Sequence, residues 1–111
     1  MIYELRTYWA AEGKAEALHA RFREVTMGLF RKHGLQVVGF WVPQTVSAES
    51  GDLIYVLQFA DEAAMKKAWE GFRADPLWLE TLARTEKDGR LAARVQSIVM
   101  HSTDYAPQVS G

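Results

Sequence analysis

The chain has 111 residues, no cysteine and a formal net charge of −1, because 13 basic residues nearly balance 14 acidic ones. This length predicts one domain with one core, and the charge balance argues against a nucleic acid or a membrane as partner. The lack of cysteine excludes disulfides and thiolate chemistry. We expect a cytoplasmic protein with a single domain over residues 1–105 and a flexible tail at 106–111.

The first half of the chain predicts a strand, a helix and a second strand. Residues 2–9 alternate as a strand does. Across 14–32, apolar residues recur every three or four positions, which is the spacing of one buried helical stripe. The stripe comprises Ala15, Leu18, Phe22, Val25 and Leu29. Gly34 is suited to ending the helix, and the β-branched and aromatic residues of 35–46 predict the second strand.

The second half adds one strand, two helices and a final strand. The polar stretch SAESGD predicts a turn, so the strand that follows it forms a hairpin with the one before. Asp61 and the pair Asp75-Pro76 are typical helix starts. The expected elements cover 53–59 (strand), 62–74 and 76–86 (helices) and 91–101 (strand).

This order predicts a ferredoxin-like α+β fold, βαββαβ, with an extra short helix before the last strand. Helices would cover one face of the sheet, yet the second and third strands are largely apolar on both faces. A sheet with one face in water alternates more cleanly. We therefore expect a homodimer through the uncovered sheet faces, closing an α+β barrel with a cavity between the sheets.

The first strand, IYELRTYW, carries the sharpest candidate site. Glu4, Arg6 and Tyr8 share one side, and we expect this side to face the interior between the two sheets. Arg6 could clamp a carboxylate or phenolate, and Glu4 could act as a base if burial raises its pKa. The alternative is a structural ion pair.

Four further residues are candidates. His33 ends the first helix, where it could cap carbonyls or act as an acid or base at a pocket mouth. Trp41, Trp69 and Trp78 belong either to the core or to the walls of a pocket for a flat ligand. The three histidines lack the spacing of a metal site, and nucleotide-binding motifs are absent. We expect neither a metal nor a cofactor.

The segments IYELRTY, HGLQVVGFW, AWEGFRADPLW and STDYAP together resemble the NIPSNAP family. The resemblance covers nearly the whole chain. It implies a ferredoxin-like domain that dimerises through its sheets, the dimeric α+β barrel. The superfamily of this barrel also includes cofactor-free monooxygenases, haem-degrading enzymes and muconolactone isomerases.

Three functions agree with these features. The first is a homodimer that binds a small apolar or aromatic ligand in its barrel. The second is a cofactor-independent monooxygenase or isomerase acting on an aromatic or polyketide-like substrate, with Arg6 stabilising an anion and Glu4, Tyr8 or His33 moving protons. The third is a structural or adaptor dimer with a filled interior. Fold alone does not choose among them.

Overall fold

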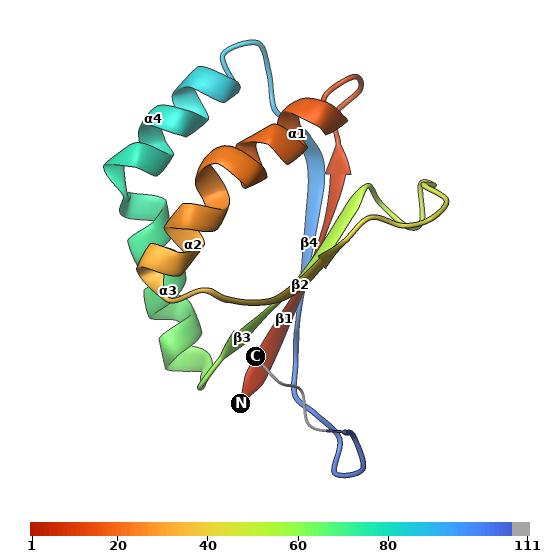
Figure 1. Ribbon diagram of the computed structural model, residues 1–111, viewed down its shortest axis with the longest axis vertical. Coiled ribbons are helices and arrows are strands. Elements are labelled where there is room, and N and C mark those ends of the chain that lie inside the picture. Colours follow the sequence, from red (N-terminus) through yellow and green to blue (C-terminus); the bar gives the residue numbers. More distant parts are fainter. Residues whose placement is uncertain (108–111) are drawn as a thin grey trace.

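The computed structural model describes residues 1–107, which form a four-stranded antiparallel sheet with all helices on one face (Figure 1). The strand order is β2-β3-β1-β4. The strands are β1 (Ile2–Ala10), β2 (Gln36–Trp41), β3 (Leu53–Phe59) and β4 (Ala92–Met100). This arrangement confirms the ferredoxin-like α+β fold. Of the predicted tail, residues 108–111 lie outside the described residues.

The helices follow the predicted boundaries closely, with one difference. The first helix runs through α1 (Ala15–Arg21), a π-helical segment η1 (Phe22–Thr26) and α2 (Met27–His33), and Gly34 ends it with φ +79. The π segment was not predicted, because its residues keep the apolar spacing of an ordinary helix. The other helices are α3 (Glu62–Ala74) and α4 (Pro76–Thr85), capped by the Asp61 and Asp75 side chains.

The core lies between the helices and the sheet and is rich in aromatic residues. Phe30 contacts both Tyr55 of β3 and Trp69 of α3, at ring-centroid distances of 5.9 and 5.7 Å. Leu18, Phe22 and Leu29 of the predicted stripe are buried, and so are Ala68, Trp69 and Phe72 of α3. Aromatic edge contacts add to the stability from apolar burial, so this layer provides a rigid support for β1 and α3.

The second strand is shorter than predicted. It pairs with β3 only as far as Trp41 and Ile54, whereas the prediction extended it to residue 46. Pro43, two residues after Trp41, has no N–H to donate to a ladder. Residues 42–52 instead form a loop that projects, with the segment after β4, on the side away from the helices (Figure 1).

The predicted orientation of β1 is wrong. Arg6 pairs with Tyr55 and Glu4 with Leu57, and both β3 residues are buried on the helix side of the sheet. Glu4, Arg6 and Tyr8 therefore face the helices. Tyr3, Leu5 and Thr7 lie on the other side, hereafter the open face, together with the residues paired to them on the neighbouring strands. These are Gln58, Val56, Ile54, Met100, Ile98 and Gln96.

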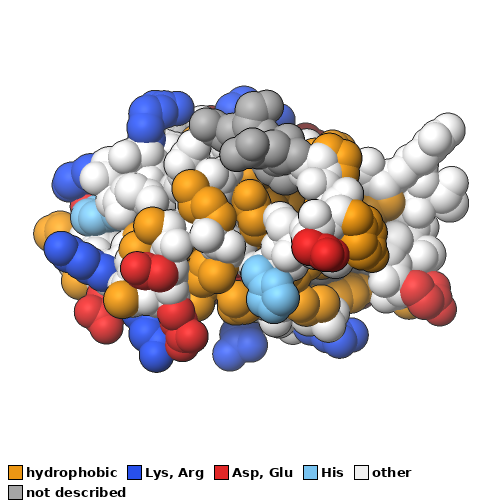
Figure 2. Space-filling view, turned by 90° about the horizontal axis from the view of Figure 1, so that it is seen from below, with side chains coloured by type: hydrophobic (Ala, Val, Ile, Leu, Met, Phe, Trp, Pro, Cys, Tyr) orange, Lys and Arg blue, Asp and Glu red, His pale blue; other side chains and the backbone are white. Residues whose placement is uncertain are grey.

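The open face is largely apolar at its centre. Leu5 lies between Val56 on β3 and Ile98 on β4, and Ile98 is 44% exposed. Hydrophobic side chains also gather across the middle of the end seen in Figure 2, with charged side chains mostly around its edge.

The helices of the described residues 1–107 are too short or too polar to span a membrane.

Candidate ligand-binding site

A cluster of polar side chains lies between the sheet and helix α3. Its centre is the ion pair of Glu4 and Arg6, with 3.0 Å between Arg6 Nη1 and Glu4 Oε2. The Glu4 side chain is only 5% exposed and the Arg6 side chain 13%. A buried ion pair persists when its remaining donors and acceptors are also satisfied, and the neighbours of this pair meet that condition.

Glu4 accepts hydrogen bonds from three different elements. Its Oε1 accepts from Trp69 Nε1 of α3 at 2.7 Å. Its Oε2 accepts from Ser97 Oγ of β4 at 2.5 Å, besides the contact with Arg6 of β1. One buried carboxylate thus connects the central strand, the edge strand and the covering helix.

Arg6 is held by two phenols. Its Nε donates to Tyr55 Oη at 2.9 Å and its Nη2 to Tyr8 Oη at 3.3 Å, while the two phenol oxygens lie 3.1 Å apart. The guanidinium also lies over the Trp69 ring, 4.5 Å from its centroid, which is a cation–π distance.

These contacts shift the pKa values of two members of the cluster, Arg6 and Tyr55. Burial alone would lower the pKa of Arg6, but the nearby Tyr55 and Tyr8, with Glu4, more than offset this and raise it. Burial, followed by Tyr8, raises the pKa of Tyr55 well above its ordinary value, although Arg6 opposes the shift. At neutral pH the cluster therefore holds a charged guanidinium beside a neutral Tyr55 phenol.

The cluster forms the inner wall of a groove of about 350 Å³ between α3 and strands β1 and β4. Glu4, Arg6, Trp69, Arg73, Ser97 and Val99 are among its lining residues. The Arg73 guanidinium lies 5.0 Å from the centroid of the Trp69 ring. Volumes of this size lie at the lower end of the range for small-molecule pockets. The cation of Arg73 and the apolar side chains of Met65 and Val99 suit a small ligand with an apolar body and an anionic group.

The structure brings four of the predicted site residues together, namely Glu4, Arg6, Tyr8 and Trp69, and separates three from them. Trp41 lies on the open face, 51% exposed, where a Cβ on Gly39 would approach its ring to 2.6 Å. Trp78 packs against Phe72, at a centroid distance of 4.7 Å, and against Arg21. Of the two alternatives for Trp78, the structure shows packing against the core, and Trp78 does not line the groove.

His33 connects two helical segments. Its Nε2 lies 2.7 Å from Asp75 Oδ2, which also accepts from Lys32 Nζ at 2.8 Å, while Asp75 Oδ1 accepts from Leu77 N as the cap of α4. The end of α2 is thereby fastened to the junction of α3 and α4. Among residues 1–107, no group of three histidine or acidic side chains is placed to hold a metal ion.

Replacing Asp75 by Asn should lower Tm more at pH 6 than at pH 3. Hydrogen bonds from Lys32, then His33 and the Leu77 N–H, hold the pKa of Asp75 below its usual value. A depressed pKa contributes stability that is complete above about pH 4 and is lost as the pH falls further. Thermal unfolding at both pH values measures this difference.

The matched control for Asp75 is Asp61→Asn. Asp61 caps α3 through Ala64 N, and Asn caps a helix about as well as Asp does. This variant therefore tests the change of a capping residue without the contacts to Lys32 and His33, and its Tm should change much less. Equal losses at the two positions would contradict the assigned role of Asp75.

The residues of the site that escaped the sequence analysis include Tyr55, Ser97 and Arg73. Both Tyr55 and Ser97 are direct cross-strand partners of Arg6. The alternation of β3 could have indicated Tyr55 once the order of the strands was known. Ser97 and Arg73 are ordinary surface residue types, and only the register of β4 and the packing of α3 reveal them.

Comparisons with known proteins agree with this architecture. The NIPSNAP family model matches residues 3–107. An uncharacterized NIPSNAP domain protein from Burkholderia xenovorans superposes with a TM-score of 0.80 at 18% identity, covering 97% of this chain and 100% of the other. A NIPSNAP family protein from Agrobacterium tumefaciens gives 0.80 at 18% identity, covering 96% of each chain.

A more distant fold neighbour is an antibiotic biosynthesis monooxygenase, with a TM-score of 0.58 at 11% identity over 93% of this chain and 99% of the other. No curated protein sequence matches this chain. The structural likenesses establish a shared fold, and the family model spans all four strands of the sheet. The chain therefore belongs to the NIPSNAP family.

Proposed function

We propose that the protein is a homodimer that binds a small aromatic or apolar ligand with an anionic group, and that the ligand occupies the groove beside α3. The observation that carries the proposal is the buried Glu4–Arg6 pair at the inner wall of a groove that also presents Trp69. In this arrangement the ligand lies between one sheet and its helices, whereas the sequence predicted a ligand between two sheets.

The formal charges around the groove nearly cancel, but the position of Arg73 suits an anion. Glu4 is neutralised by Arg6, and Lys66 is compensated by Glu62 at 3.2 Å. Glu70 and Arg73 also line the groove, and Arg73 lies against the indole face. The Arg73 guanidinium can pair with a carboxylate, while Met65 and Val99, which also line the groove, contact the apolar body of the ligand.

The open face supports the dimer. Its centre, around Leu5, Val56 and Ile98, is apolar, and polar Gln58 beside it is buried with its Oε1 lacking a partner among residues 1–107. The loop 42–52 projects beyond this face, and the segment after β4 extends past the end of the sheet (Figure 1). A second copy related by a two-fold axis would cover the same patch on both chains.

Binding without turnover is favoured over the monooxygenase or isomerase alternative by the state of Glu4. A general base needs a free lone pair near the proton that it removes. Three of the roughly four acceptor positions of the Glu4 carboxylate are already occupied and its charge is paired with Arg6, while Asp75 holds His33 in the helical layer. The structural likeness to the monooxygenase concerns the fold and does not identify a general base in this chain.

Native mass spectrometry of the freshly purified protein, before and after denaturation, tests the proposal. We expect a dimer carrying an added small mass that is lost on denaturation. Val99 lines the groove and is 51% exposed, so Val99→Trp should fill the mouth and remove the adduct from a folded dimer.

Val95→Trp is the matched control, because Val95 lies on the same strand and the same face and is 42% exposed. It does not line the groove, so the adduct should persist. An adduct that survives Val99→Trp would place the ligand elsewhere. A dimer with no adduct would favour the structural or adaptor function, and a monomer would contradict the proposed assembly.

A further inference from the structure

We propose a second ligand site, a groove between the first helix and the edge strand β2 that takes an elongated alkyl chain ending in a carboxylate. The groove consists of two adjoining cavities of about 440 and 300 Å³, which share Met27. It has no lining residue in common with the groove beside α3. The inference therefore stands or fails independently of the function proposed above.

The helix presents a regular row of side chains to this groove: His19, Arg23, Met27 and Arg31, each four positions after the last. Positions four apart drift around an ordinary α-helix, because a turn takes 3.6 residues. The wider π turns of Phe22–Thr26 offset this drift. The π segment thus keeps the row aligned with β2 over about 18 Å, at 1.5 Å per residue.

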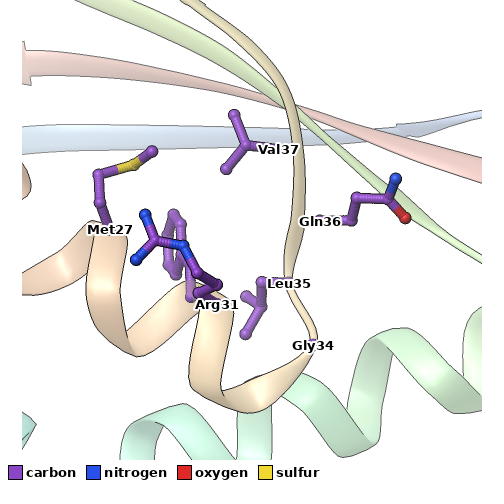
Figure 3. Close-up of a pocket in the computed structure, with 7 residues that line it drawn as sticks. Met27, Arg31, Gly34, Leu35, Gln36 and Val37 are labelled. Carbon is purple, nitrogen blue, oxygen red and sulfur yellow. The ribbon is translucent and has the colours of Figure 1, made fainter. Parts of the chain in front are cut away.

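The floor of the groove is apolar along its length. In the larger cavity, Leu35 and Val37 lie beside the helix, and Met27 and Arg31 extend over the space between (Figure 3). In the smaller cavity, Phe22 and Phe40 provide aromatic surface. Methionine adapts to ligands of varied shape, and the carbon stem of an arginine can cover an alkyl chain.

Charge and backbone geometry indicate the class of ligand. Arg23 is exposed and forms no ion pair within residues 1–107, and His19 lines the same cavity. We assign the carboxylate to Arg23 and the alkyl chain to the apolar floor past Met27. An added peptide strand is a poorer occupant, because β2 has a bulge between Val37 and Gly39, and bulges disfavour pairing at an edge.

Isothermal titration with dodecanoate, below its micelle concentration, tests this site. We expect micromolar affinity and at least tenfold weaker binding of octanoate, because four fewer methylenes are buried. Arg23→Gln should weaken dodecanoate binding about tenfold, since it removes a charge-assisted hydrogen bond. Met27→Asp should weaken it further, whereas Arg90→Gln, at an exposed arginine that lines neither cavity, should leave it unchanged.

Methyl NMR of the wild-type protein locates the ligand without any substitution. Signals of Met27 and Val37 should shift with dodecanoate, and those of Leu5 and Val56 on the open face should not. Equal affinity of wild type and Arg23→Gln, or shifts confined to the open face, would overturn the proposal. Met27 and Val37 signals that respond to protein concentration but not to dodecanoate would also overturn it, and would identify a second copy as the occupant.

Discussion

Glu4→Gln should destabilise the protein by about 3 kcal/mol, because it leaves a buried guanidinium without its counter-ion. The amide also cannot accept from all three donors of Glu4, so its NH₂ group would meet the N–H of Trp69 or the donors of Arg6 and Ser97. Denaturant unfolding measures the loss as a lower midpoint at an unchanged m-value.

Glu70→Gln provides the control for this substitution. Glu70 lines the same groove from α3 but is exposed, and the change should cost less than about 0.5 kcal/mol. A double-mutant cycle with Arg6→Met then isolates the pair, and its coupling energy should exceed about 1 kcal/mol. A loss of less than about 1 kcal/mol for Glu4→Gln would mean that water, rather than the cluster, solvates the carboxylate.

Local sequence patterns predicted most of the fold. Residues 53–59 and 62–74 match β3 and α3 residue for residue, because a turn, a cap and clear periodicity bound them. The end of β2 was less well defined, since Trp41, Val42 and Val46 suit a strand but pair only up to Trp41. Strand propensity does not reveal where the partner strand stops.

The sequence predicted which residues of β1 form the candidate site, but not the residues that surround them. The alternation of β1 correctly placed Glu4, Arg6 and Tyr8 on one side, but it could not say which side the helices cover. A charged strand face is typical of an interface or of a surface in water, whereas here Trp69, Tyr55 and Ser97 form the hydrogen bonds that permit burial. Those partners lie 49 or more positions away in sequence, so only the strand register and the packing of α3 bring them to β1.

Leu5→Asp should convert the proposed dimer into a monomer. Leu5 occupies the middle of the open face between Val56 and Ile98, so a two-fold interface across this face would bury the new carboxylate twice, without a partner for either copy. Each buried charge costs several kcal/mol, and a loss of about 2.7 kcal/mol already weakens a dissociation constant a hundredfold. Light scattering after size exclusion, at micromolar protein, measures the mass.

Val95→Asp is the control that separates loss of the interface from a general effect of added charge. Val95 is an exposed apolar residue on the helix side of β4, so this variant should remain a dimer. A Leu5→Asp protein that stays dimeric would show that the chains associate through another surface, and a monomeric wild type would show that the open face has a different partner. In the expected case, the Leu5→Asp monomer keeps the Glu4–Arg6 cluster intact, because the cluster lies on the opposite side of β1 and takes all its hydrogen bonds from one chain.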